Sequence, residues 1–288
     1  MKKTALITGI VVFVVLVAFP FFWQFLTSLK SPAEVWAAPP VWLPTEGFEP
    51  APIEWGDDTF VAPRFVENYT AIFAHHPFGR YLLNSAIVAT VTTLVCLLFG
   101  CMAGYALAKL NFPGKTAILS LTLTVSMFPQ VAIAPTLFLV LKNFDLIDRY
   151  AGLVLPYTTF AMPLALWNLT TFFRQIPDEL KESAIVDGAT PWKTFWQIFL
   201  PLATPGIFTT GILTFIAAWN EFLFALYFTN SEAMRTVPVG IALFPGQYEA
   251  PWGQIAAASV VVTLPLIVLV LLAQKRLVSG LTAGAVKG

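Results

Sequence analysis

Six long apolar stretches place the strongest limit on how this chain of 288 residues can fold. Each stretch is long enough for a helix to cross the hydrocarbon core of a bilayer, which takes about 20 residues. Only 11% of the residues are charged, whereas soluble domains carry roughly 25%, so a water-facing surface cannot be covered in the usual way. We therefore predict an all-α polytopic membrane protein with six transmembrane helices, near residues 5–27, 82–107, 117–141, 151–173, 204–228 and 255–274.

The first apolar stretch follows Met1-Lys2-Lys3 and has the position of a secretory signal peptide. Its apolar run is longer than the roughly 7 to 15 residues of such a peptide, and no small-residue cleavage site follows closely. We interpret residues 1–27 as a retained N-terminal transmembrane anchor helix.

The distribution of lysine and arginine predicts the orientation, because cytoplasmic loops carry an excess of both. With the N-terminus inside, the inner segments hold ten of the 16 basic residues. The sequence thus predicts a multi-pass protein of the cell (inner, cytoplasmic) membrane with both termini cytoplasmic. The inner basic residues are Lys2, Lys3, Lys109, Lys115, Arg174, Lys181, Lys193, Lys275, Arg276 and Lys287.

Residues 28–80 then form an extracytoplasmic loop rich in proline, tryptophan and acids. Tryptophan at a membrane boundary commonly marks the headgroup region. A loop of this length is also often functional or partly structured. A contact surface for another protein is therefore the second interpretation of this loop.

A polar segment at residues 175–203, called the coupling segment below, interrupts the apolar pattern. Pro177 followed by two acids is a typical helix start, since proline tolerates the first turn and acids favour the N-terminal end of the dipole. Gly188 is suited to end that helix, and a second helix is predicted to begin near Thr190-Pro191. From these features alone, an ordinary helix at the membrane surface explains the segment.

The residue types in this segment indicate a more specific assignment. Glu182-Ser183-Ala184, Asp187-Gly188, Ile198 and Leu200-Pro201 reproduce the EAA-x3-G-x9-I-x-LP signature, with serine where alanine is most frequent. In this signature the chain resembles the permease subunits of binding-protein-dependent ABC importers. The resemblance implies a type I importer fold with a permease core at 81–274. It also implies that Glu182, Ser183, Ala184, Asp187, Gly188, Ile198, Leu200 and Pro201 couple the chain to an ATPase.

Two further segments resemble carbohydrate importers of this family. They are the Trp219-Asn220-Glu221-Phe222 quartet and the C-terminal tail at 275–288, which resembles the cytoplasmic tail of the second permease of maltose-type importers. The implied substrate is a disaccharide or oligosaccharide such as maltose, maltodextrin or trehalose. A small carbohydrate ester stays open, although the spans offer no arginine to hold a phosphate.

The implied partners are a homologous second permease, two cytoplasmic ABC ATPase subunits, an extracytoplasmic sugar-binding protein and the lipid bilayer. ATP and magnesium would be used by the ATPase partners, and we predict no cofactor in this chain. Gly114-Lys115-Thr116 is not a phosphate-binding loop, because the glycine required five residues earlier is Lys109. We therefore predict no catalytic residue and no enzyme activity in this chain.

Polar residues at membrane depth are the candidates for the translocation pathway, because an ionisable group there costs at least ~2.5 kcal/mol unless it is paired or hydrated. They are Gln130, Asn168, Asn220 and Glu221. A structural pair at 220–221 explains the same residues. The alternative from another class is an ion-coupled secondary transporter that uses Glu221, although no internal repeat of the usual kind is found. A membrane scaffold without transport is a third possibility, which leaves the coupling segment unexplained.

Other expectations concern packing and excluded chemistry. Pro129, Pro135, Pro156 and Pro163 are predicted to kink their helices, and the small residues Gly100, Ala103, Gly104 and Ala106 to permit close helix packing. Cys96 and Cys101 lie in an apolar run and are expected to be buried rather than to bind metal. A net charge of zero does not favour nucleic acid, and we predict no metal site.

Overall fold

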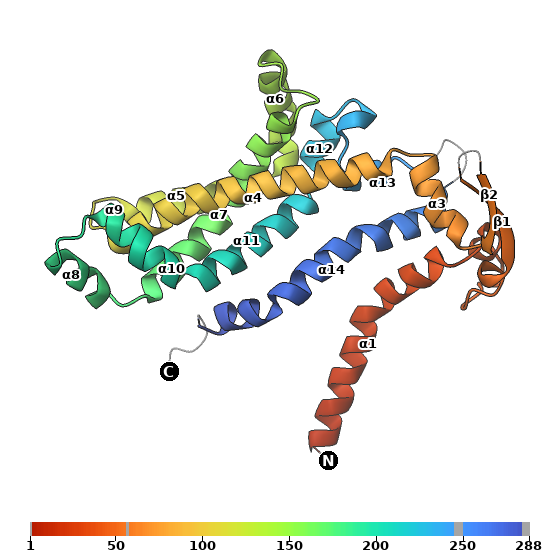
Figure 1. The fold of residues 1–288 in the computed structure, drawn as a ribbon, viewed down its shortest axis with the longest axis horizontal. Helices are drawn as coiled ribbons and strands as arrows, with labels where there is room; N and C mark the ends of the chain where they lie inside the picture. The colour runs from red at the N-terminus through yellow and green to blue at the C-terminus, as the bar shows by residue number, and fades with distance from the viewer. Residues whose placement is uncertain (1, 56–57, 245–249, 284–288) are drawn as a thin grey trace. The chain divides into compact units, whose positions relative to one another are not determined.

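The computed structural model describes residues 2–55, 58–244 and 250–283, and its elements are shown in Figure 1. The chain divides into two compact units, one of residues 1–80 and 239–265 and the other of residues 81–238 and 266–288. Each unit is described by itself.

The first unit begins with a long apolar helix, α1 (Lys2–Ser28), and continues into a small folded lobe. Side chains of α1 such as Phe13 and Leu16 are 67% exposed, as expected of a helix whose surroundings are lipid. The lobe contains α2 (Pro32–Val35), a short 3-10 helix η1 (Glu46–Phe48), strands β1 (Pro50–Trp55) and β2 (Asp58–Pro63), and α3 (Val66–Ala74).

The two strands of the lobe pair antiparallel, with Ile53 opposite Phe60. Ala51 and Ile53 alternate with exposed residues and are buried, so one face of the hairpin packs on α3. The expected extracytoplasmic loop at 28–80 is therefore structured, and within the described residues this hairpin is the one departure from helical secondary structure.

The second unit is a helical bundle that contains the coupling segment. Its elements are α4 (Phe78–Lys109), α5 (Lys115–Ser126), α6 (Gln130–Asn143), α7 (Tyr150–Gln175), α8 (Glu179–Val186), α9 (Pro191–Thr194), the π-helical turn η2 (Phe195–Phe199), α10 (Leu200–Leu202), α11 (Thr204–Trp219), α12 (Leu223–Phe228), η3 (Glu232–Met234), α13 (Val237–Ala242) and α14 (Trp252–Ala283). Three of its helices, α4, α13 and α14, also contribute residues to the first unit.

The core of the second unit depends on close contact between α4 and α7. A Cβ atom at Gly104 would lie 3.2 Å from Leu169 Cβ, and one at Gly100 would lie 2.9 Å from Leu169 Cδ1. The prediction that small residues permit close packing here is confirmed. Cys96 and Cys101 are buried free thiols on the same helix, also as predicted.

A buried polar cluster fixes the start of α4 within this unit. Asn84 Nδ2 donates to the carbonyls of Ala233 and Arg235 at 2.9 Å, and Tyr150 donates to Asn84 Oδ1 at 2.8 Å. The Ser85 hydroxyl accepts from the Val237 amide at 2.9 Å. These two side chains therefore tie α4 to η3, α13 and α7.

Among the described residues, three helices are long and apolar enough to cross a membrane, in α1, α4 and α14. Two bent pairs raise that number to five if each pair is one span: α5 with α6, bent by 92°, and the α9–α10 region with α11, bent by 75°. Helix α7 covers the predicted fourth span but is not among these five, since hydroxyl and amide groups interrupt its apolar sequence.

Two predicted spans are not the continuous helices that we expected. The span at 117–141 breaks between Ser126 and Gln130, at Pro129, whose extended backbone precedes α6. The span at 204–228 breaks after Trp219 and resumes at Leu223. Pro135, Pro156 and Pro163 lie inside helices.

The last predicted span ends where expected, since the apolar span in α14 covers Trp252–Ala273, although the helix itself continues to Ala283. Residues 284–288 of the predicted tail lie outside the described residues.

Candidate functional site: the coupling segment

The first helix of the coupling segment forms where the sequence predicts it. Asp178 is the N-cap of α8, and its carbonyl accepts the amides of Lys181 and Glu182 at 2.9 and 3.0 Å. Gly188 follows with φ of +74°, a conformation that glycine adopts without strain. The Gly188 amide reaches the Ile185 carbonyl at 3.0 Å, which closes the helix.

The exposure of α8 shows which side is available to another molecule. Ala184 is buried, whereas Val186 is 87% and Ile185 58% exposed. Glu182 and Ser183 are exposed as well. The small residues of the signature therefore do not form one buried stripe, because only Ala184 packs inward.

The second half of the coupling segment packs against the bundle. Thr190 is the N-cap of α9 and accepts the Lys193 amide at 3.2 Å, which confirms the predicted second helix start. Ile198 and Leu200 pack against a buried cluster that includes Phe195 and Phe199. Pro201 follows in α10 and is exposed.

Tyr105 of α4 is the centre of the aromatic cluster that holds this segment. Its ring centroid lies 5.1 Å from that of Phe195, 5.2 Å from that of Phe199 and 6.0 Å from that of Phe173. Such aromatic pairs add about 0.5–1.5 kcal/mol each beyond the burial of their area. The segment is therefore attached firmly to α4 and α7 while α8 projects an exposed face.

The pathway candidates are only partly brought together. Gln130 and Glu221 line one pocket of about 100 Å³, with Tyr157, Phe160 and Phe224. Asn220 does not line it; this exposed side chain donates to the Ile216 carbonyl at 2.8 Å. Asn168 is half-buried on α7 and does not line it either.

Glu221 has a local structural task that the sequence analysis did not foresee. Its carboxylate accepts the amides of Phe224 and Ala225 at 2.8 and 3.2 Å, at the start of α12. These two bonds stabilise the start of α12 directly after the break in the predicted fifth span at 220–222. The sequence signal for this role was an acidic residue, Glu221, placed three residues before Phe224, whose backbone amide it accepts.

A second carboxylate that the sequence analysis missed organises the lobe of the first unit. Glu34 is 5% exposed, and Ser31 and Glu34 form a reciprocal capping box around α2. Burial raises the pKa of Glu34, but hydrogen bonds from the amides of Thr45, Ser31 and Glu46 and from the Thr45 hydroxyl outweigh it and lower this pKa to about 2. The Ser-x-x-Glu pattern at 31–34 was the sequence signal.

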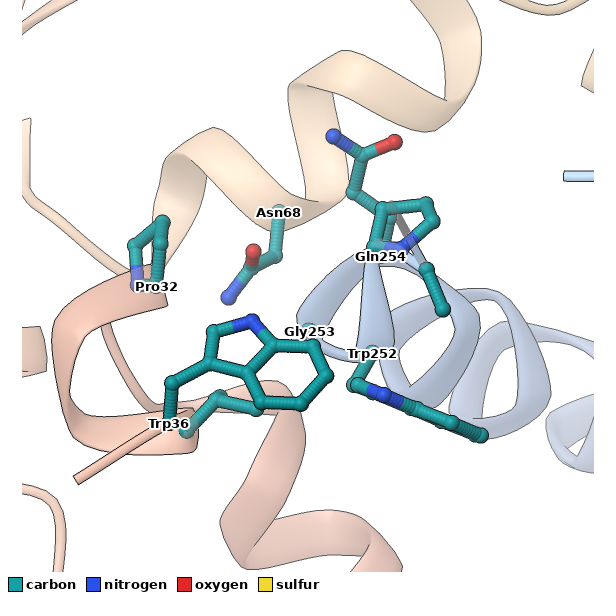
Figure 2. A pocket seen from close by; sticks show the side chains of 9 residues that line it. Pro32, Trp36, Asn68, Trp252, Gly253 and Gln254 are labelled. Atoms are coloured by element: carbon teal, nitrogen blue, oxygen red, sulfur yellow. The ribbon is translucent and has the colours of Figure 1, made fainter. Parts of the chain in front are cut away.

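The first unit also carries a pocket with exposed indoles, formed between the lobe and residues 250–254 of the same unit and shown in Figure 2. Its volume is about 190 Å³, and Trp36 and Trp252 line it with exposures of 67% and 48%. Asn68 lines the same pocket beside Trp36, and its Nδ2 donates to the carbonyls of Ser28 and Lys30. Within the described residues, no group of three potential metal ligands occurs.

The long apolar helices are those of a protein that crosses a membrane several times. Residues 96–282 match the family described as Binding-protein-dependent transport system inner membrane component, and the chain belongs to this family. It is the permease subunit of an ABC importer and a multi-pass inner membrane protein, and the ATPase activity of such a system lies in partner subunits.

Two curated relatives are similar over most of their length. The Trehalose transport system permease protein SugB of Mycobacterium tuberculosis is 46% identical over 224 residues, which are 77% of this chain and 82% of that protein. The Trehalose/maltose transport system permease protein MalG of Thermococcus litoralis is 40% identical over 291 residues, 100% of this chain and 98% of that protein.

A solved structure has the same fold. A chain in the crystal structure of a bacterial ABC transporter involved in the import of the acidic polysaccharide alginate matches with a TM-score of 0.74 at 18% identity, and the match covers 95% of this chain and 96% of that chain.

Proposed function

We propose that this permease carries a disaccharide or oligosaccharide of the trehalose, maltose or maltodextrin type, and that α8 couples it to a cytoplasmic ATPase. The observation that carries the proposal is the exposed face of α8 within the importer signature, where Glu182 stands beside Ile185 and Val186. The sugar class is supported by the relatives SugB and MalG, whose names refer to trehalose and maltose.

The exposed face of α8 combines the two properties of a docking helix. Ile185 and Val186 supply apolar area, worth roughly 25 cal/mol per Å² when it is covered. Glu182 supplies a carboxylate for a basic residue of the ATPase, and its loss at a partly buried interface costs about 2–5 kcal/mol. Two ATPase copies, with ATP and magnesium, would serve this chain and a homologous second permease.

We place the translocation pathway beside the pocket formed by Gln130 and Glu221. Its amide and carboxylate groups provide hydrogen-bond partners and Phe160 and Phe224 provide apolar walls, which is the usual composition of a site for a polar organic ligand. Asn220 and Asn168 stay candidates for other positions along the pathway. This chain would form half of it, and the second permease the other half.

We assign the lobe at 28–80 to the extracytoplasmic side, as a contact for a sugar-binding protein. The exposed Trp36 and Trp252 support this, since tryptophan is enriched in interface hot spots. The arrangement requires both termini, and the coupling segment at 175–203, to be cytoplasmic. Transport then proceeds by alternating access, in which closure of the ATPase dimer displaces α8 and changes which side of the bundle is open.

The test is uptake of radiolabelled trehalose and maltose by proteoliposomes that contain the whole complex and its binding protein. We expect ATP-dependent uptake, and we expect Glu182→Ala to reduce it at least tenfold together with ATPase retention on the permease. Glu179→Ala, an exposed acid on the same helix outside the signature, should have a smaller effect. Uptake that is independent of ATP and depends on a proton or sodium gradient would contradict the proposal and favour the ion-coupled alternative at Glu221.

A further inference from the structure

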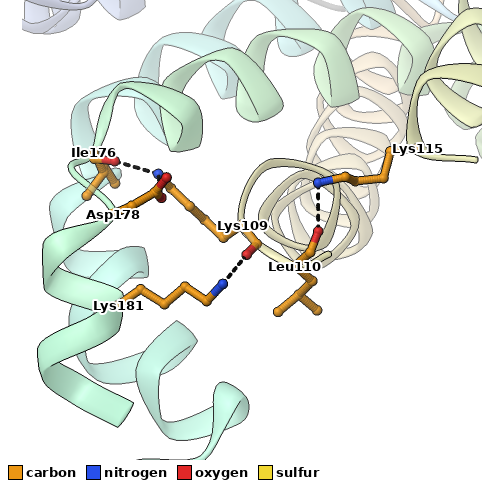
Figure 3. A network of polar contacts seen from close by, with 6 residues as sticks. All are labelled: Lys109, Leu110, Lys115, Ile176, Asp178 and Lys181. Carbon is orange, nitrogen blue, oxygen red and sulfur yellow. Dashed lines mark hydrogen bonds and ion pairs between the residues drawn. The ribbon is translucent and has the colours of Figure 1, made fainter. Parts of the chain in front are cut away.

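A buried lysine joins the end of α4 to both ends of the coupling segment. Lys109 is the last residue of α4, and its side chain is only 3% exposed. Its Nζ donates to Asp178 Oδ1 at 2.6 Å and to the Ile176 carbonyl, as Figure 3 shows. The same ammonium lies 5.6 Å from the centroid of the Phe199 ring.

These contacts reach three different parts of the segment. Ile176 is the C-cap of α7, and Asp178 is the N-cap of α8. Phe199 belongs to the turn η2, which follows α9. One ammonium group therefore interacts with the chain before α8, with the N-cap of α8 and with the turn that follows α9.

A second hydrogen bond runs in the opposite direction between the same two elements. Lys181 of α8 donates from its Nζ to the Lys109 carbonyl at 2.6 Å. The side chain of Lys109 thus holds the N-cap of α8, and a side chain from the first turn of α8 holds the backbone of Lys109. Two bonds at separate points resist both sliding and rotation of α8 against α4.

Burial of the ammonium makes this connection stiffer than an ordinary surface ion pair. Exposed pairs contribute about 0–1 kcal/mol, and Asp178 is itself 73% exposed. Lys109, however, cannot exchange its partners for bulk water without leaving its buried position, and an unpaired buried charge is strongly unfavourable. The hydrogen bond and charge of the Lys109 ammonium also hold the pKa of Asp178 below its usual range.

We propose that Lys109 is the positioning residue that passes displacement of the coupling helix α8 to the long helix α4. The inference rests on the proposed function, in which α8 binds the ATPase. The ATPase-facing residues are on the exposed side of α8, while the bonds to Lys109 are at its first turn. Loss of the connection leaves docking intact but allows α8 to move without α4, so ATP is hydrolysed with less transport.

The experiment measures sugar uptake and ATP hydrolysis in the same proteoliposomes, with the binding protein present, and reports sugar molecules moved per ATP. Lys109→Met removes the ammonium at similar length, and Asp178→Asn removes the negative charge of its partner at a side chain that is 73% exposed. We expect both to lower this ratio about fivefold or more, as loss of a coupling free energy of 1–3 kcal/mol would. The conservative variants Lys109→Arg and Asp178→Glu keep the charges and should retain most of the native ratio of sugar per ATP.

Lys115→Met is the matched control, because the Lys115 ammonium hydrogen-bonds the Leu110 carbonyl within the turn after α4 and acts on Asp178 only through the weakest of the Coulomb attractions there. Its ratio should stay within twofold of the unchanged chain. A purely structural role would reduce the amount of assembled complex without changing sugar per ATP in the complexes that remain. An unchanged ratio in Asp178→Asn, with normal ATPase retention, would overturn the proposal. Failure of the unchanged chain to retain the ATPase would instead refute the proposed function.

Discussion

Replacing Glu34 with glutamine should loosen the lobe of the first unit without unfolding the membrane helices. In the native chain, Glu34 Oε1 accepts the amide and hydroxyl of Thr45 and the amide of Glu46, at 2.6, 3.0 and 3.0 Å. Oε2 accepts the amides of Ser31 and Gly47 at 3.0 and 3.2 Å. A glutamine has one acceptor oxygen, so its amino group must face at least two of these donors.

The magnitude follows from two independent lines of reasoning. Two buried donors left without an acceptor cost about 1–3 kcal/mol each. The pKa of Glu34, lowered from 4.5 to about 2, corresponds to roughly 3 kcal/mol in favour of the ionised form, and nearer 2 after solvent screening. We therefore expect a loss of about 2–4 kcal/mol in the free energy of local opening.

Hydrogen–deuterium exchange of the whole purified chain in detergent measures this quantity directly. The amides of Thr45, Glu46 and Gly47 should exchange about 30-fold to several hundredfold faster in Glu34→Gln, since each 1.4 kcal/mol is tenfold in the opening constant. Glu54→Gln, an exposed acid on β1 of the same lobe, is the control and should change little. Less than threefold acceleration at residues 45–47 would refute the reasoning that this carboxylate holds the lobe closed.

Two other results are expected from the same contacts. Because the folded pKa of Glu34 is depressed, its contribution is complete above pH 4.5 and is lost as pH falls toward 2. The opening constant of the lobe, obtained by dividing the exchange rate by the intrinsic amide rate at each pH, should therefore rise across this window in the native chain and change less in Glu34→Gln. Equal pH dependence of the two opening constants would contradict the assignment. Asn84→Ala removes three hydrogen bonds of a fully buried side chain and should lower the free energy of unfolding by about 2–4 kcal/mol. The measurement is the midpoint of thermal inactivation in detergent, which should fall. A midpoint within a degree of the native value would show that the cluster is not stabilising.

Several structural features of this protein could be predicted from the sequence because they depend on residues that are adjacent in the chain. The length of an apolar run determines whether a helix can span a bilayer, and the positions of α1, α4 and α14 follow from it. The limits of α8 follow from Pro177 and Gly188, whose backbone preferences act on the nearest turn. The signature at 182–201 likewise identified the family before any fold was known.

Only the tertiary structure decided which polar groups meet. Lys109 and Asp178 are 69 positions apart, and neither hydropathy nor spacing indicates that they pair. The break in the predicted fifth span has a similar origin, since Glu221 could be a pathway group or a helix cap until the folded chain brought its carboxylate to the start of α12. Sequence pattern determines which segments are apolar or helical, because those properties are local; the partner of a buried charge depends on how distant helices pack, and that information is distributed over the whole chain.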